Sequence, residues 1–210
     1  MTETIKLLVA TNNPGKIREY EDLLAELPPG VEITFPAREG LDLEVEESGR
    51  TFEENARLKA EAYAAASGLP ALADDSGLEV DALGGAPGVR SARYGGPGAS
   101  DEDRYRKLLA ALDGLPAGRR AARFRCVVAL ALPGGPVWTA EGRFEGEIGF
   151  TPRGAHGFGY DPVFVVAGYG GQTLAELAPE LKNRISHRAR ALEAARPHLR
   201  AMLQRLQEGD

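Results

Sequence analysis

The sequence of 210 residues has one cysteine, three histidines and no long apolar run. A lone thiol cannot form a disulfide within the chain, and the apolar neighbours of Cys126 predict inert packing in a buried strand. So few cysteines and histidines, far apart, argue against a zinc site. No apolar stretch approaches the ~18–20 residues of a membrane span, and Met1–Lys6 lacks the basic and apolar parts of a secretion signal. We therefore expect a soluble, cytoplasmic protein without a membrane partner.

Positive charge is also in short supply, because the formal net charge is -6 and only five of the basic residues are lysines. A broad cationic surface is absent, so nucleic acid is not an expected partner, and any nucleotide ligand should be small and enclosed. The 43% hydrophobic content supports a substantial core. We expect residues 1–210 to form a single domain.

Strand-like apolar runs alternate with segments of helical periodicity, a pattern typical of an α/β protein. Strands are expected at residues 5–10, 31–35, 69–74, 78–83, 123–132, 137–147 and 162–166. Helices are expected at residues 17–27, 51–67, 100–112 and 186–206, with further helical signals from Thr173 and a kink or break at Pro197. Ser76 and Gly77 are typical of a turn. The first strand and helix favour parallel pairing and the turn at residues 133–136 favours an antiparallel return, so the sheet should be mixed and twisted, with flanking helices.

Two adjacent aspartates, Asp74 and Asp75, end an apolar run that we interpret as a buried strand. Buried carboxylates destabilise a fold unless a cation balances them. Glu44, Glu46 and Glu47 lie in the preceding connection, and ligands made only of oxygen suit Mg²⁺, which also keeps waters and binds substrate phosphates. The segment predicts a magnesium site. The alternative is a solvated acidic loop, with one aspartate capping the following turn.

Thr11–Lys16 joins the end of a strand to the start of a helix, where backbone amides and the helix dipole favour an anion. Lys16 adds a formal positive charge in the first helical turn. Ile17 stands where a P-loop requires serine or threonine, so that motif does not apply. The segment predicts a phosphate contact, and a plain capped turn is the alternative.

Gly154–Pro162 combines glycines with two rings, Phe158 and Tyr160, that could stack on a flat ligand, while Asp161 could accept from its donors. A tight turn of glycine and aromatic residues is the alternative. Leu181–Arg188 places three cations and a histidine before the final helix. Positive charge at a helix N-terminus opposes the dipole, so either an anionic ligand or a solvated basic surface should explain it.

In this order the segments resemble the inosine triphosphate pyrophosphatase family, the Ham1-like enzymes that hydrolyse non-canonical purine nucleoside triphosphates. The resemblance covers nearly the whole chain. It is carried by Thr11–Lys16, Glu46–Gly49, Thr51–Ala56, Ala73–Leu78, Gly84–Gly88, Ser91–Tyr94, Gly157–Pro162 and Ser186–Arg188.

The resemblance implies an elongated α/β domain of two lobes with the active site in a cleft between them, usually forming a homodimer. It also implies Mg²⁺-dependent hydrolysis of ITP, dITP or XTP to the monophosphate and pyrophosphate. Asp75 would be the proton acceptor and a metal ligand, Glu46 the second metal ligand, and Asp74 a supporting carboxylate. The implied substrate-binding residues are Thr11, Asn12, Asn13, Pro14, Gly15, Lys16, Ser76, Phe158, Gly159, Tyr160, Asp161, Lys182, His187 and Arg188.

Base selectivity is expected to rest on a donor, either Arg188 or a backbone amide, that bonds the 6-oxo group of the purine. Adenine presents a donor at that position and would leave the donor of the site unpaired. Two alternatives stay open: a related pyrophosphatase with another base preference, and a nucleotide-binding module without catalysis.

Overall fold

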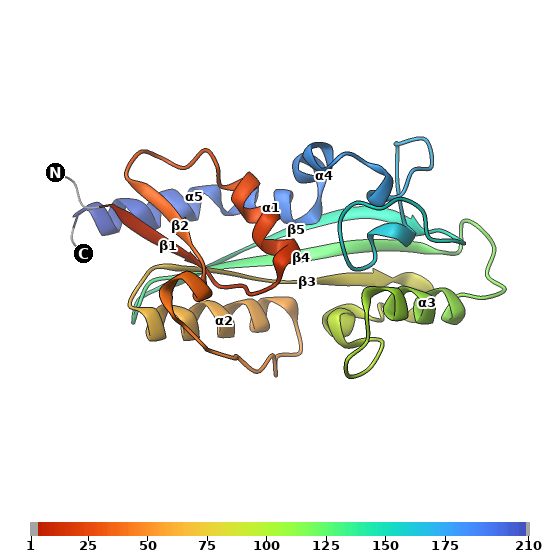
Figure 1. The fold of residues 1–210 in the computed structure, drawn as a ribbon, viewed down its shortest axis with the longest axis horizontal. Helices are drawn as coiled ribbons and strands as arrows, with labels where there is room; N and C mark the ends of the chain where they lie inside the picture. Colours follow the sequence, from red (N-terminus) through yellow and green to blue (C-terminus); the bar gives the residue numbers. More distant parts are fainter. Residues whose placement is uncertain (1–3, 209–210) are drawn as a thin grey trace. The chain divides into compact units, whose positions relative to one another are not determined.

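A computed structural model describes residues 4–208 of the chain. The first three residues of the N-terminal segment and both ends of the expected domain of residues 1–210 therefore lie outside the described part. The strands are β1 (Ile5–Val9), β2 (Val31–Thr34), β3 (Ala71–Val80), β4 (Ala121–Ala131), β5 (Val137–Ile148) and β6 (Phe164–Val166). The helices are α1 (Pro14–Leu23), α2 (Phe52–Ser67), α3 (Asp101–Ala111), α4 (Pro179–Ile185) and α5 (His187–Glu208) (Figure 1).

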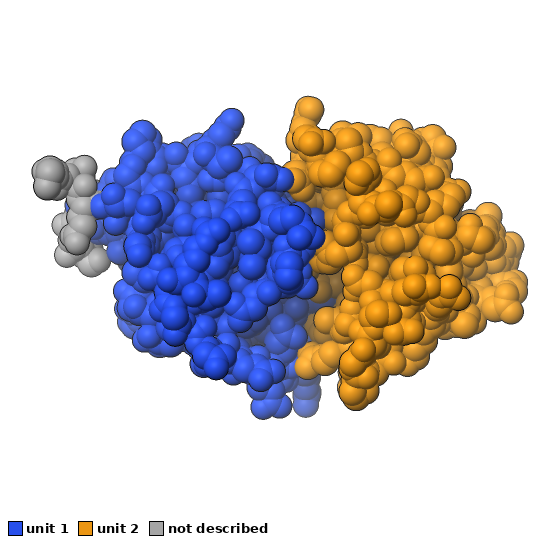
Figure 2. Space-filling view, viewed as in Figure 1, with its two compact units in different colours: residues 1–75, 126–142, 188–210 blue, residues 76–125, 143–187 orange. Residues whose placement is uncertain are grey.

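The six strands form one mixed sheet in the order β2-β1-β3-β4-β5-β6. Strand β1 pairs in parallel with β2 and with β3, whereas β5 and β6 are antiparallel. The expected α/β class with a mixed sheet and flanking helices is confirmed. The chain divides into two compact units, shown in Figure 2: unit 1 holds residues 1–75, 126–142 and 188–210, and unit 2 holds residues 76–125 and 143–187. The expected single domain and the cleft stay predictions.

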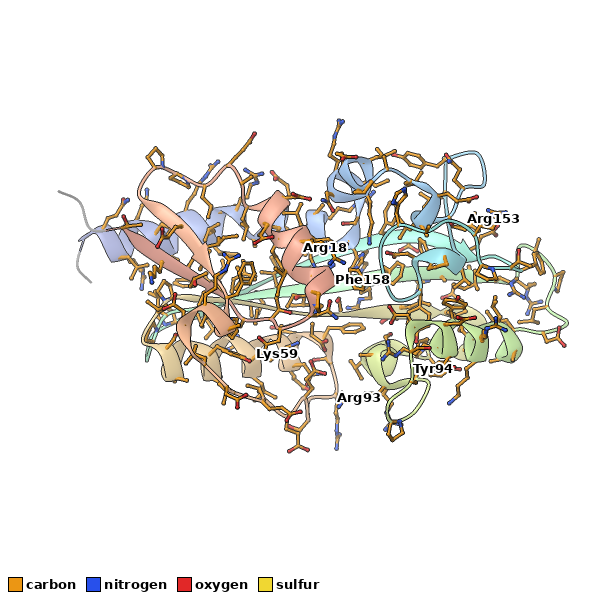
Figure 3. All side chains as sticks on the ribbon, in the orientation of Figure 1. Arg18, Lys59, Arg93, Tyr94, Arg153 and Phe158 are labelled. Atoms are coloured by element: carbon orange, nitrogen blue, oxygen red, sulfur yellow. The ribbon has the colours of Figure 1, made fainter. Side chains whose placement is uncertain are left out.

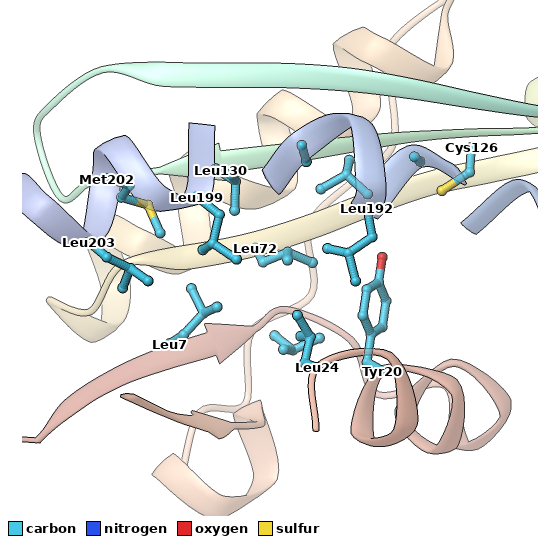
Figure 4. Close-up of a cluster of buried hydrophobic side chains, with 14 of the residues drawn as sticks. Leu7, Tyr20, Leu24, Leu72, Cys126, Leu130, Leu192, Leu199, Met202 and Leu203 are labelled. Carbon is cyan, nitrogen blue, oxygen red and sulfur yellow. The ribbon is translucent and has the colours of Figure 1, made fainter. Parts of the chain in front are cut away.

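The core of unit 1 joins β1, β3 and β4 to α1 and α5 (Figure 4). Leu192, Leu199 and Leu203, which form the apolar face of α5, are buried there within the single chain. Helix α5 continues through Pro197, so the expected break is absent. Burial of this face supplies the free energy that holds α5 against the sheet.

Unit 2 has its own core, in which Leu78 and Phe124 of the sheet pack with Leu108 of α3, Phe164 of β6 and Leu174. The helices expected from residues 51 and 100 are present, and each begins with a capping box, at Thr51 for α2 and at Ser100 for α3. In each box, the hydroxyl of the first residue accepts from a backbone amide of the first helical turn. The acidic side chain three residues later accepts in turn from the backbone amide of that first residue, so both helices begin where the sequence predicts.

Strand β3 runs without interruption from Ala71 to Val80. The turn expected at Ser76 and Gly77 was wrong, as were the separate strands on either side of it. Pairing with neighbouring strands overrides the turn preference of a serine and a glycine. As a consequence Asp74 and Asp75 lie within a strand and not at its end.

Candidate active site

Strand geometry sends the side chains of Asp74 and Asp75 to opposite faces of the sheet. Asp74 shares a face with Leu72, which packs in the core with α1 and α5, whereas Asp75 contacts α2. Figure 1 shows α2 across the sheet from α1 and α5. Two adjacent buried carboxylates are therefore compatible, because their charges are balanced by residues of different helices, α1 and α5 for Asp74 and α2 for Asp75.

Asp74 is an acceptor shared by two cations in unit 1. Its Oδ2 lies 2.9 Å from Lys16 Nζ and 3.1 Å from Arg188 Nη2. Burial would raise the pKa of Asp74, but Lys16 and Arg188 outweigh burial and hold that pKa well below its ordinary value. The Cys126 thiol also donates to Oδ2 at 3.6 Å. The sequence predicted a cation beside these aspartates, and for Asp74 the cations are side chains.

Arg188 is the second residue of α5, and its side chain is 1% exposed. Its guanidinium contacts Glu19 of α1 as well as Asp74. These contacts join α1, β3 and α5 in a buried charge network of Lys16, Asp74, Arg188 and Glu19. The basic charge at this helix start thus has carboxylate partners, and the contact of Arg188 with a purine stays a prediction.

Asp75 is held by two residues of α2 that are absent from the predicted site. Asn55 donates to Asp75 Oδ2 at 2.9 Å, and Lys59 Nζ lies 3.9 Å from Asp75 Oδ1. Burial raises the pKa of Asp75, although Lys59 and Asn55 oppose the shift. A carboxylate with a raised pKa binds a proton more strongly than an exposed one, which suits a proton acceptor.

A sequence signal for these two residues was present, because Asn55 and Lys59 are four apart and so share one face of a helix. Figure 3 labels Lys59 on α2. Asn55 is fully buried, and its Oδ1 accepts from Gly49 N at 2.8 Å. A Cβ at Gly49 would lie 2.6 Å from that Oδ1, so glycine is required for the contact. The stretches matched at residues 46–49 and 51–56 are thereby joined to Asp75.

Lys59 also connects the acidic loop to the strand. Its Nζ donates to Glu47 Oε1 at 2.8 Å and to the Asp74 carbonyl at 2.6 Å. Glu47 is half-buried, whereas the predicted metal ligand Glu46 is exposed. The contacts of Lys59 therefore bring Glu47 into the group around Asp75, and the metal role of Glu46 stays a prediction.

The oxygen donors of this loop and of Asp75 fit Mg²⁺ in their chemistry. In residues 4–208 no three histidine, cysteine or acidic side chains are grouped closely enough to hold a metal ion by themselves. Mg²⁺ commonly uses one or two carboxylates and fills its shell with water and substrate phosphate oxygens. A site of two carboxylates that is completed by substrate is consistent with that preference.

The start of α1 is a capped turn. Asn13 Oδ1 accepts from Gly15 N at 2.9 Å and from Lys16 N at 3.1 Å, and Thr11 Oγ1 accepts from Asn13 N. The predicted alternative of a cap is therefore present. Those two amides are therefore engaged in the cap, and the phosphate contact of residues 11–16 stays a prediction.

Unit 2 holds a second group of predicted site residues, built around the loop that carries Phe158 (Figure 3). Lys182 Nζ forms a buried ion pair with Asp161 and lies 4.8 Å from the centroid of the Phe158 ring. His187 is buried and stacks on Phe124 at 4.8 Å between centroids. Ser76, of β3, is half-buried in the same unit.

The sequence predicted Lys182 next to the start of the final helix. The structure places it instead in the last turn of α4. Cations near a helix C-terminus interact favourably with its dipole. The electrostatic conflict inferred from the sequence is therefore absent at Lys182, and Asp161 balances its charge directly.

Comparison with known proteins identifies the family. A sequence model described as the Ham1 family matches residues 7–198. The chain belongs to the Ham1 family. This confirms the resemblance carried by the ordered motifs.

Several relatives carry the name dITP/XTP pyrophosphatase, and two of them show how similar this chain is to them. The protein of Methylococcus capsulatus is 56% identical over 200 residues, which are 94% of this chain and 97% of that protein. The Bacillus subtilis protein is 48% identical over 186 residues, which are 89% of this chain and 92% of that protein.

Solved Ham1 structures share the fold. The Staphylococcus aureus Ham1 protein superposes with a TM-score of 0.81 at 40% identity, covering 94% of this chain and 99% of its own. A structure from Mycobacterium abscessus, described as nucleoside-triphosphatase / dITP/XTP pyrophosphatase, gives 0.74 at 45% identity, covering 93% and 100%.

Proposed function

We propose that this chain hydrolyses the non-canonical purine nucleoside triphosphates dITP, XTP and ITP to the monophosphate and pyrophosphate. The observation that carries the proposal is high identity, along nearly the full chain, to relatives named dITP/XTP pyrophosphatase. The buried Asp75, held by Asn55 and Lys59, supplies the acceptor group that such a hydrolysis needs. Removing these nucleotides would keep them out of the cellular pool.

In the proposed reaction a water oxygen attacks the α-phosphorus and the bond to the bridging oxygen breaks, releasing pyrophosphate. Asp75 orients the water and accepts its proton, while Lys59 and Asn55 fix the carboxylate. Lys16 offsets the negative charge of the phosphates, and Ser76 and the residues from Thr11 to Gly15 contact the substrate.

Mg²⁺ is the proposed cofactor, with Asp75 and an acidic residue of the 44–47 loop as its ligands. When bound, the ion would polarise the phosphate oxygens and lower the pKa of a coordinated water. Glu46 is the ligand implied by resemblance, and Glu47 is the neighbour whose carboxylate reaches Lys59. Replacing each with glutamine and measuring the Mg²⁺ concentration for half-maximal activity would separate them.

The nucleoside is assigned to the residues of the second group. The Phe158 ring would stack on the purine, and Asp161, Lys182 and His187 would support or contact it, with Gly159 and Tyr160 in the same loop. Arg188 would join them through a guanidinium donor that its carboxylate partners leave for the base.

We also expect one functional domain, a homodimer and a cytoplasmic location. As a separate finding, no helix among the described residues has the length and apolarity to cross a membrane.

A substrate panel tests the function. Release of pyrophosphate is measured from dITP, XTP and ITP beside ATP, GTP and dTTP, with Mg²⁺ present. Much higher kcat/KM on the first three is expected. Equal rates on ATP would favour a pyrophosphatase of other base preference, and binding of ITP without pyrophosphate release would favour a nucleotide-binding module.

A further inference from the structure

The loop that carries Phe158 is fixed by its own polar groups and by three other parts of unit 2. Asp161 Oδ2 accepts from Phe158 N at 2.9 Å and pairs with Lys182 of α4. A Cβ on Gly157 would lie 2.0 Å from that same Oδ2, and Gly157 has a φ of +77°. Glycine is thus required here, because any larger residue would expel the carboxylate that fixes the loop.

A second contact comes from α3. Asp101, the first residue of that helix, accepts from Gly159 N at 2.7 Å. The helix is capped by Ser100 and Asp103, which bond each other's backbone amides. Asp101 is therefore not the cap, and its carboxylate reaches a loop 58 residues away in the sequence. Arg104 pairs with the same carboxylate, which restricts its rotamer.

The third contact gives a role to the motif at residues 91–94. The Tyr160 hydroxyl donates to the Ser91 carbonyl at 2.8 Å, and Tyr160 is 4% exposed. The Ser91 hydroxyl accepts from Leu78 N at 2.8 Å and donates to the Gly88 carbonyl at 2.7 Å. Ser91 consequently links Tyr160 to β3 and to the end of the Gly84–Gly88 segment.

These contacts divide the two rings of the loop into different roles. The Tyr160 hydroxyl and the amides of Phe158 and Gly159 are engaged within the protein, and the Tyr160 ring is buried. Phe158 is half-buried, so its ring is the aromatic surface that the loop presents. Its position is set in part by Asp101 and Ser91, which lie outside the predicted substrate contacts.

We infer that Asp101 and the Ser91–Tyr160 pair are positioning residues for recognition of the purine base. They hold the backbone on both sides of the Phe158 ring, and neither needs to touch the phosphates. The inference deepens the proposed function and rests on it, because it takes the Phe158 loop as the nucleoside site. It assigns base affinity and selectivity in part to residues of α3 and of the 84–94 segment.

The test compares Asp101→Ala with Asp101→Asn, which keeps an acceptor oxygen, and adds Tyr160→Phe. KM and kcat are measured for dITP and dGTP, together with the inhibition constant of pyrophosphate. Because one such hydrogen bond is worth about 1 kcal/mol, we expect the KM for dITP to rise about fivefold in Asp101→Ala and Tyr160→Phe. The dITP preference over dGTP should fall, Asp101→Asn should restore most of it, and pyrophosphate inhibition should not change.

Glu102→Ala is the matched control, since Glu102 is the next residue of α3 and its exposed carboxylate pairs within the helix, with Arg106. It should behave as the wild-type protein. A loss of thermal stability in Asp101→Ala with unchanged base preference would overturn the inference and assign Asp101 a purely structural role.

Amide hydrogen exchange provides a readout that does not depend on activity. The Phe158 and Gly159 amides should exchange faster in Asp101→Ala and in Tyr160→Phe than in the Glu102→Ala control. Unchanged exchange overturns the inference even if the substrate panel supports the function. If the wild-type protein releases no pyrophosphate from dITP, the proposed function fails, and the inference about base recognition fails with it.

Discussion

The two units solve the problem of burying polar groups in different ways. Unit 1 buries full charges and balances each with another, from Lys16 through Asp74 and Arg188 to Glu19. Unit 2 buries the ion pair of Asp161 with Lys182 and otherwise holds its loop through single hydrogen bonds between a side chain and a backbone group. Formal charges are suited to binding phosphates and metal ions, whereas the Phe158 ring, held in one position, is suited to stacking on a flat, neutral base.

The difference has an energetic side. Removing one partner of a buried charge network leaves an uncompensated ion, which destabilises by about 3–5 kcal/mol. Removing one neutral hydrogen bond costs about 1 kcal/mol. Variants in unit 1 should therefore affect stability and all substrates, and variants in unit 2 should affect the choice of base.

The largest effect is expected for Asp74→Asn. The substitution leaves Lys16 and Arg188 facing a neutral amide, so the free energy of unfolding should fall by about 3–5 kcal/mol. Urea unfolding followed by circular dichroism measures it, with Asp42→Asn, an exposed residue of the same unit, as the control. A loss below about 1 kcal/mol would contradict the buried-network account.

The same residue gives the network a pH dependence. The pKa of Asp74 is lowered in the folded protein, so its contribution is complete above the unfolded pKa of about 3.9 and is lost as pH falls below it. The stability difference between wild type and Asp74→Asn should therefore shrink as the pH falls below about 4. A constant difference would show that charge is not the cause.

The next effect is on turnover. Asp75→Asn should lower kcat by about 100-fold or more, the scale of losing a general base or metal ligand. Because burial raises the pKa of Asp75, its charged form does not stabilise the fold, and the variant should unfold at the same or a higher urea concentration. Unchanged turnover would refute the role of Asp75.

A smaller effect separates the two units by substrate. Lys16→Ala should raise KM about tenfold for every triphosphate, since a charged hydrogen bond is worth about 1.5–3 kcal/mol.

Phe158→Ala should raise KM by a similar factor for dITP, because stacking contributes about 1–3 kcal/mol, but it should leave pyrophosphate inhibition unchanged. If both variants change pyrophosphate inhibition equally, the division of labour is wrong.

The smallest effect is expected at the surface charges of unit 2. Arg123 contacts Glu79, Asp81 and Glu145, all partly or largely exposed. Solvent screens such pairs, so Arg123→Ala should change stability by no more than about 1 kcal/mol and leave activity intact. A larger loss would mean that charge also supports unit 2.

Local sequence patterns predicted much of this fold. The capping boxes of α2 and α3 and the α/β class follow from spacing that depends on neighbouring residues only. The continuity of β3 did not, since Ser76 and Gly77 favour a turn until adjacent strands pair with them. Pairing depends on distant residues, which one local window does not contain.

The candidate site was predicted in its motifs but not in its supports. Asp75 and Lys16 stood out as charges in apolar or turn settings. Glu19 and Asp101 did not, because their partners lie 169 and 58 residues away, so local spacing does not distinguish them from other acidic residues of a helix. Such contacts depend on tertiary packing, which spacing along the chain does not encode.

The single thiol, Cys126, provides a way to measure how often the core of unit 1 opens. Burial, together with the charge of Asp74, raises the pKa of Cys126, so the reactive thiolate is scarce and shielded in the folded protein. An alkylating reagent should reach it only when unit 1 opens. Mass spectrometry of one labelled site would then count those openings, and the rate in Asp74→Asn would report how strongly the charge network keeps the unit closed.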